Sequence, residues 1–117
     1  MWLRKQPAID SSRGFLATNL DFVWQNYKTC DWMLIEEKRY GAKPQFWQAA
    51  IFRLLDWCAR HHRHYHGFHL VQFENTNPDD GKTWLDGRQV TPAELIAFLQ
   101  FDAVSEPLPD FLGMKEN

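Results

Sequence analysis

Two short segments decide the expected fold: Leu20-Asp21-Phe22-Val23-Trp24 and, after a polar turn, Met33-Leu34-Ile35-Glu36-Glu37-Lys38. Aromatic, β-branched and other apolar residues dominate both segments, which is typical of β-strands. Side chains alternate between the two faces of a strand, so Glu36 and Lys38 share one face. If the two strands pair, Asp21 joins these two side chains at the edge of a sheet.

The rest of the chain is expected to alternate strands and helices around these segments. In the first half we expect a strand over 15–24, which begins around Phe15 and is most clearly indicated from Leu20, and then a turn over 26–31. A second strand over 32–39, a cluster of helix- and strand-breaking residues over 40–44, and a helix from Gln45 to about His61 follow. The second half predicts a strand over 67–74, a polar loop over 75–82, a hairpin over 83–90 turning at Asp86-Gly87, and a helix from the capping box Thr91-Pro92-Ala93-Glu94 through Phe101.

The helix expected from Gln45 carries its apolar residues along one arc, which should face the core. That arc holds Trp47, Ala50, Ile51, Leu54, Leu55 and Cys58, and the opposite arc holds Gln45, Arg53, Asp56 and Arg60. Gln48 lies on the border between the two arcs. This helix side chain is therefore the best placed to point along the sheet toward a site.

The order strand, strand, helix, strand, hairpin, helix predicts an α/β (α+β) fold in which helices flank a small mixed β-sheet. The segment over 67–74 is mostly apolar and suits a central strand covered on both faces. A chain of 117 residues with 44% apolar content fits one domain, 1–117, with a core over about 15–101 and a tail over 102–117.

Charge and hydropathy narrow the class of protein. No run of 18 apolar residues is present, and the first residues carry charge and proline where a signal peptide needs apolar residues, so a soluble, cytoplasmic protein is expected without a membrane partner. Net charge is −2, but residues 1–65 balance at +4 and residues 66–117 at −6, so the first part could face a phosphate backbone. Cys30 and Cys58 are too few and too far apart for a disulfide scaffold or a CxxC zinc site, and free thiols are expected.

Two carboxylates and one ammonium at a sheet edge suit phosphodiester hydrolysis, which needs a divalent cation and an activated water. Asp21 and Glu36 would hold Mg²⁺ or Mn²⁺ together with the main-chain carbonyl of Glu37. Lys38 would position the attacking water and offset the charge of the transition state. The Glu37 side chain points to the opposite face, and Asp31 lies in a turn, so both are weaker candidates for the acidic roles.

Asp21, the run Ile35-Glu36-Glu37-Lys38 at the end of an apolar strand, and the following helix with Gln48 resemble the PD-(D/E)XK nuclease superfamily over roughly residues 15–75. The resemblance implies a restriction-endonuclease-like core and a Mg²⁺- or Mn²⁺-dependent endonuclease that hydrolyses DNA with a water nucleophile. It also implies Asp21 and Glu36 as metal ligands and Lys38 as the catalytic lysine. The spacing from Lys38 to Gln48 is similar to that in the VRR-Nuc and Holliday-junction-resolvase-like branches, which adds Gln48 to the catalytic set.

DNA is the expected partner, branched and single-stranded forms included, and a homodimer with one site per strand is expected because the domain is small. The candidate nucleic-acid contacts are basic residues outside the acidic cluster: Arg13, Arg39, Lys43, Arg60 and Arg63. Trp32 and Trp47 are better explained by packing than by a stacking role, whereas the roles of Trp2 and Trp84 stay open.

Two alternatives remain open. In the first, Glu36 and Lys38 form a surface ion pair on a non-catalytic module that binds nucleic acid or protein. In the second, the histidines of the stretch 61–69 bind zinc or copper, for which His62 and His66 could share a helix face. Against the second, histidines near a helix C-terminus are commonly explained by favourable interactions with its carbonyls and dipole.

Overall fold

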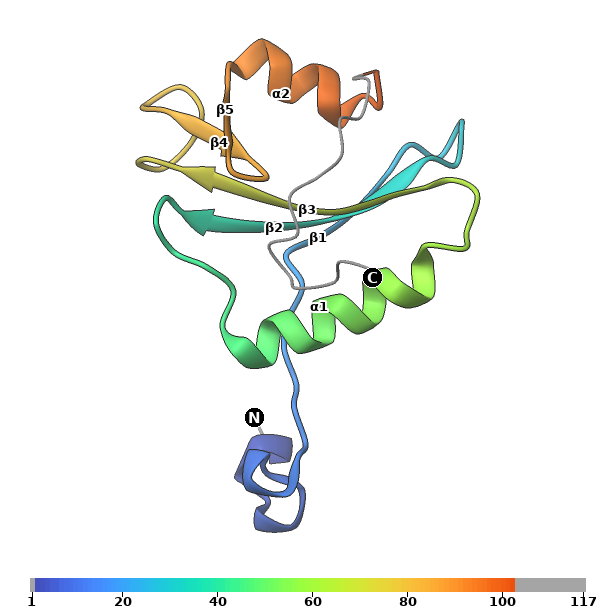
Figure 1. Ribbon diagram of the computed structural model, residues 1–117, viewed down its shortest axis with the longest axis vertical. Coiled ribbons are helices and arrows are strands. Elements are labelled where there is room, and N and C mark those ends of the chain that lie inside the picture. Colours follow the sequence, from blue (N-terminus) through green and yellow to red (C-terminus); the bar gives the residue numbers. More distant parts are fainter. Residues whose placement is uncertain (1, 103–117) are drawn as a thin grey trace, which may run out of the picture.

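The computed structural model describes residues 2–102, in which five strands form one sheet and two α-helices flank it (Figure 1). The elements are β1 (Phe22–Gln25), β2 (Trp32–Arg39), α1 (Phe46–Ala59), β3 (Tyr65–Phe73), β4 (Thr83–Leu85), β5 (Arg88–Val90) and α2 (Pro92–Leu99). The expected order of elements and the expected mixed α/β architecture are confirmed.

The sheet has the strand order β1-β2-β3-β4-β5 and is mixed. β2 and β3 run parallel, whereas the other three neighbouring pairs are antiparallel. Parallel neighbours need a crossover connection, and α1 supplies it. The middle strand is β3, which is buried from Phe68 to Gln72, as expected for a central strand covered on both faces.

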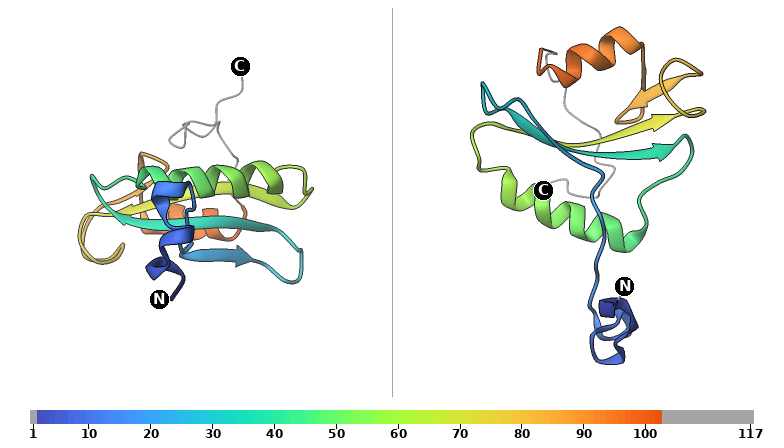
Figure 2. Two further views of the ribbon diagram at one scale, coloured as in Figure 1. Left: turned by 90° about the horizontal axis from the view of Figure 1, so that it is seen from below. Right: turned by 180° about the vertical axis from the view of Figure 1, so that it is seen from behind.

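The two helices lie on opposite faces of the sheet (Figures 1 and 2), which we name the α1 face and the α2 face. On the α1 face, Leu34, Phe52 and Phe68 form one buried cluster. On the α2 face, a second cluster consists of Met33, Ile35, Val71, Leu85 and Leu95. Because side chains alternate along β2, Glu36 and Lys38 follow Leu34 on the α1 face.

The first strand is shorter than the sequence predicts. β1 begins at Phe22 and not around Phe15, and it pairs with β2 only over four residues, from Phe22 opposite Ile35 to Gln25 opposite Trp32. Strand propensity is realised only where a neighbouring strand provides hydrogen bonds. Before Phe22 the strand pairing does not continue. The Asp21 N–H donates a hydrogen bond to the side-chain carboxyl of Glu36 and not to a main-chain carbonyl of β2.

The inward face of α1 was also predicted wrongly. Phe52 is its buried residue, whereas Trp47 is 43% and Leu54 61% exposed. The helix instead turns a mixed face to the sheet, on which Gln48 bonds Lys38 and Asp56 accepts a hydrogen bond of 2.6 Å from the Tyr65 hydroxyl. Polar groups that find partners can be buried at little cost, and these two contacts fix the rotation of the helix.

The second helix starts as expected and ends early. Thr91 Oγ1 accepts a hydrogen bond from the Glu94 N–H at 3.1 Å, and Glu94 Oε1 accepts one from the Thr91 N–H at 3.0 Å, which completes the predicted capping box. The helix stops at Leu99 because Phe101 has a left-handed φ of 61°. The carbonyl of Leu99 accepts a hydrogen bond from the Trp24 indole at 2.8 Å, which ties the helix end to β1.

Thr91→Ala is expected to lower the free energy of unfolding by about 1 kcal/mol, because it removes the acceptor for the Glu94 N–H. Thr91→Ser keeps this acceptor and should stay close to the wild type. Urea denaturation followed by circular dichroism compares the three proteins. Equal midpoints for Thr91→Ala and the wild type would contradict the role of the cap.

The N-terminal residues form three short 3₁₀ helices, η1 (Trp2–Lys5), η2 (Pro7–Ile9) and η3 (Ser11–Arg13), which stand apart from the sheet (Figures 1 and 2). Within residues 2–102, no helix has the length and apolar character needed to cross a membrane. Apart from Asp102, the expected tail lies outside the described residues.

Candidate active site

Two of the predicted catalytic residues, Glu36 and Lys38, lie at the C-terminal end of β2, on the α1 face, and Asp21 lies beside them. Glu36 lies opposite Leu70 and Lys38 lies opposite Gln72 in the parallel ladder with β3. Glu36 is only 2% exposed. A carboxyl buried to this degree needs hydrogen-bonding partners, and the neighbouring segments supply them.

Asp21 and Glu36 are held together by reciprocal contacts with the main chain. The Asp21 N–H donates to Glu36 Oε1 at 3.1 Å, and the Glu37 N–H donates to Asp21 Oδ2 at 2.8 Å. Each bond joins the residue before β1 to the end of β2. The edge of the antiparallel hairpin therefore fixes two carboxyls side by side.

This arrangement disfavours the ionised form of Glu36. Burial and then the neighbouring Asp21 raise the pKa of Glu36 to about 7, although Lys38 opposes the shift. Burial and the charge of Asp21 also raise the pKa of Glu37. A buried carboxyl with a raised pKa beside a second carboxyl is typical of functional sites, where a cation can relieve the repulsion.

Lys38 is held between the acidic pair and the start of α1. Its Nζ lies 3.8 Å from Glu36 Oε2 and donates a hydrogen bond to Gln48 Oε1 at 3.1 Å. The same amide oxygen accepts a hydrogen bond from the Gln45 N–H at 3.0 Å, in the first turn of the helix. The beginning of α1 therefore positions the ammonium group beside the carboxyls.

The donor set fits a hard cation better than zinc. Among residues 2–102, no group of three or more His, Cys, Asp or Glu side chains is placed to hold a metal ion. The site offers two carboxyls, so main-chain oxygens and water would have to complete a coordination shell, and the carbonyl of Glu37 stays a prediction for one of them. Mg²⁺ is commonly bound by one or two carboxylates and retains several waters, whereas structural zinc takes four protein ligands.

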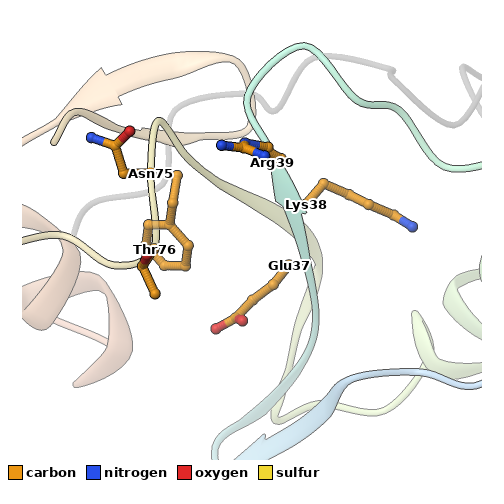
Figure 3. A pocket seen from close by; sticks show the side chains of 6 residues that line it. Glu37, Lys38, Arg39, Asn75 and Thr76 are labelled. Atoms are coloured by element: carbon orange, nitrogen blue, oxygen red, sulfur yellow. The ribbon is translucent and has the colours of Figure 1, made fainter. Parts of the chain in front are cut away.

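A hollow of about 520 Å³ opens at the same end of β2, on the side to which Glu37 and Arg39 point. Its lining consists of Glu37, Lys38, Arg39, Phe73, Asn75 and Thr76. Figure 3 shows Glu37 and Arg39 on the side of the hollow opposite Asn75 and Thr76, while the amino group of Lys38 points away from it. Glu37 thus points away from Glu36, as the strand alternation predicts, and Arg39 is the predicted phosphate contact that lines this hollow.

The other predicted nucleic-acid contacts are dispersed. Lys43 lies in the loop that connects β2, which carries Lys38, with α1, which carries Gln48. Arg60 and Arg63 follow the opposite end of α1, a 14-residue helix and thus about 21 Å long. Arg13 belongs to η3, in the N-terminal part that stands apart from the sheet. The fold therefore keeps Lys43 in the loop that follows Lys38, leaves Arg39 on the opposite face of the sheet from Lys38, and leaves the other three away from the candidate site.

The histidines of the stretch 61–69 do not share a helix face, so that prediction is wrong. α1 ends at Ala59, and the last histidines of the stretch lie in β3. Four of them have protein partners instead: Trp32 for His62 at 3.1 Å, Asp31 for His64 at 3.6 Å and for His66 at 3.0 Å, and Asp86 for His69 at 2.7 Å. These contacts favour a structural role for the cluster and for Asp31.

Sequence reasoning missed Gln72 and Tyr40, and it left the role of Trp84 open. Gln72 is buried and donates a hydrogen bond to the Ala42 carbonyl at 2.9 Å. Tyr40 and Trp84 form a near-parallel stack, with ring centroids 3.7 Å apart and planes inclined by 17°. Tyr40 could have been found from its position two residues after Lys38, whereas Gln72 and Trp84 depend on the pairing of strands.

Comparison of the chain with models of known protein families, with curated proteins and with solved structures found no match in any of the three.

Proposed function

We propose that this protein is a metal-dependent endonuclease that hydrolyses phosphodiester bonds in DNA. The observation that carries the proposal is the position of the Lys38 ammonium, 3.8 Å from the buried carboxyl of Glu36 and 3.1 Å from the amide oxygen of Gln48. An Asp, a Glu, a Lys and a Gln from three separate segments of the chain, the start of β1, β2 and α1, converge there. This convergence supports a site built for chemistry rather than a chance surface pair.

The chemistry assigns a role to each side chain. Mg²⁺ or Mn²⁺ would supply Lewis acidity at the scissile phosphate. Asp21 and Glu36 hold the ion, and their reciprocal bonds to main-chain N–H groups fix them before it binds. The Lys38 ammonium orients the attacking water and offsets the negative charge that develops on the phosphoryl oxygens. Gln48 is a positioning residue, because its amide oxygen holds Lys38 in place.

The chain order supports a restriction-endonuclease-like core and membership of the PD-(D/E)XK superfamily. Asp21 directly precedes the first strand of an antiparallel hairpin, and Glu36 and Lys38 end the second strand. The helix that follows carries Gln48 in its first turn and leads into a parallel strand. This is the arrangement that the resemblance implies for the motif.

The alternative, a non-catalytic interaction module, predicts that Glu36 and Lys38 form an ordinary surface pair. A surface pair leaves both partners in water and needs no further support. Here Glu36 is 2% exposed, and burial beside Asp21 raises its pKa to about 7. Keeping an ionisable group in such a position is unfavourable for folding, which supports the catalytic proposal over the module.

A homodimer is proposed as the working form, with the exposed apolar side of α1 as its contact. This side carries Phe46, Trp47, Leu54, Leu55 and Trp57, which are between 39% and 72% exposed. Contiguous exposed apolar side chains are typical of interaction surfaces. Sedimentation of the wild type and of Leu54→Glu tests the proposal, since the charge should shift the protein to a monomer.

Metal binding gives a direct test of the site. Isothermal titration with Mn²⁺ should show saturable binding to the wild type, and Asp21→Ala should weaken the affinity at least about tenfold, because one of the two carboxylate ligands is lost. Asp31→Ala is the matched control, since Asp31 lies in the turn before β2 beside His64 and His66. Supercoiled and branched DNA should be cut with Mg²⁺ or Mn²⁺ and not with EDTA.

Three results would contradict the proposal. Cleavage that persists in EDTA would exclude a metal-dependent mechanism. Equal weakening of Mn²⁺ binding by Asp21→Ala and Asp31→Ala would remove the link to this site. If no form of DNA or RNA is cut although Mn²⁺ binds, the interaction module becomes the better description.

A further inference from the structure

An aromatic stack lies next to the proposed catalytic lysine, on the same face of the sheet. Lys38 is opposite Gln72, and Gln72 is opposite Trp84, so these three side chains share the α1 face. Tyr40 follows Lys38 by two residues and stacks on Trp84, which places its ring on this face as well. The spacing of two strand residues separates Tyr40 from Lys38 by roughly 7 Å along the chain.

The backbone around Tyr40 is held in place. The Tyr40 N–H donates to the Phe73 carbonyl at 2.9 Å, which continues the pairing of β2 with β3 beyond Arg39. A turn then closes through a bond of 2.9 Å from the Ala42 N–H to the Arg39 carbonyl, and Gly41 takes the φ of 88° that this turn requires. The buried amide of Gln72 anchors the turn through the Ala42 carbonyl. The ring is therefore fixed before any ligand arrives.

One face of the Tyr40 ring remains available. Trp84 covers the other face in a near-parallel stack, yet Tyr40 is still 56% exposed. Packing alone would not require so exposed a ring on a rigid turn. A further flat group can extend the stack on the open side, and the exposed Lys43, two residues after Gly41 of the turn, supplies positive charge for an attached phosphate.

We propose that the stack of Tyr40 on Trp84 is the platform for an unpaired nucleobase of the nucleotide next to the scissile phosphate. This inference rests on the proposed nuclease function and deepens it by naming a substrate class. Bases stack on aromatic side chains when they are unpaired, whereas bases inside a duplex are already stacked on their neighbours. The preferred substrates are therefore single strands or branched DNA with an unpaired nucleotide at the cleavage point.

The test measures binding separately from cleavage, with Ca²⁺ in place of Mg²⁺ to prevent hydrolysis. Single-stranded oligonucleotides and a blunt duplex of equal length carry 2-aminopurine, whose fluorescence falls on stacking. The wild type should bind the single strand more tightly than the duplex and quench the probe. Tyr40→Leu should weaken binding of the single strand about 5- to 150-fold and abolish quenching, since stacking contributes about 1–3 kcal/mol per base.

Two variants control for structure and for general binding. Tyr40→Phe keeps the ring and should restore both affinity and quenching. Tyr27→Leu removes a tyrosine that is 78% exposed in the turn between β1 and β2 and should leave both unchanged. Thermal unfolding checks that Tyr40→Leu remains folded.

The possible results separate the inference from the function. Unchanged binding and quenching by Tyr40→Leu, with DNA still cut in Mg²⁺, would overturn the platform and leave the nuclease proposal intact. Tyr40-dependent binding and quenching without cleavage by any metal would support the platform and overturn the nuclease. Absence of binding to every oligonucleotide would overturn both.

Discussion

Lys38→Ala is expected to lower the rate of metal-dependent DNA cleavage about 100- to 1000-fold. Removal of one preorganised group that stabilises transition-state charge typically has an effect of this size. Lys38 is such a group, because Glu36 and Gln48 hold its ammonium in place before substrate binds. Single-turnover cleavage with saturating enzyme measures the chemical step without the contribution of DNA binding.

The matched control for this experiment is Lys28→Ala. Lys28 is an exposed lysine in the turn between β1 and β2, at the opposite end of the hairpin from the site. Its loss changes net charge by the same amount and should leave the rate within about twofold of the wild type. Comparable rates for Lys38→Ala and the wild type would remove Lys38 from the catalytic role. If Lys28→Ala lowers the cleavage rate as much as Lys38→Ala does, the effect is one of general charge and not of the site.

Glu36→Gln is expected to abolish cleavage and, at the same time, to stabilise the metal-free protein at pH 8. Glu36 is buried beside Asp21, so its ionised form is unfavourable in the folded state. Glutamine is neutral and of similar shape, and its amide can still accept the hydrogen bond from the Asp21 N–H. The free energy of unfolding in EDTA should rise by up to about 3 kcal/mol at pH 8.

The stabilisation should depend on pH in a defined direction. Below the ordinary pKa of 4.5, Glu36 is protonated in both the folded and the unfolded states, so Glu36→Gln and the wild type should be equally stable. Between 4.5 and about 7 the unfolded chain releases this proton while the folded protein keeps it. The wild type therefore loses stability as the pH rises through this range. Above about 7 the difference between the two proteins reaches its full value.

Urea denaturation in EDTA at several pH values between 4 and 8 measures the effect, and Asp79→Asn is the control. Asp79 is an exposed carboxyl in the loop between β3 and β4, and its neutralisation should change stability by less than about 0.5 kcal/mol at every pH. If Glu36→Gln is less stable than the wild type at pH 8, Glu36 is stabilised by its surroundings in its ionised form and the account of its burial is wrong.

Much of the architecture could be predicted because local patterns carry it. The alternation in 32–39, the capping box at Thr91 and the Asp86-Gly87 turn specify their own elements with few neighbours. The start of β1 could not be predicted in this way, since the residues from Phe15 to Leu20 have strand propensity but no partner strand. The buried side of α1 was predicted wrongly for a related reason. The helix has apolar residues on both sides, and the hydrogen bonds from Lys38 and Tyr65 determine which side faces the sheet.

The sequence by itself determined the order of elements and placed Glu36 and Lys38 on one strand face, because side-chain period and turn chemistry are local properties. Only the tertiary structure decided the rest of the site. The hairpin brought Asp21 to Glu36, the rotation of α1 brought Gln48 to Lys38, and the register of β3 and β4 put Trp84 beneath Tyr40. These contacts join residues distant in the chain, and they form only when strands pair and polar groups are buried with their partners.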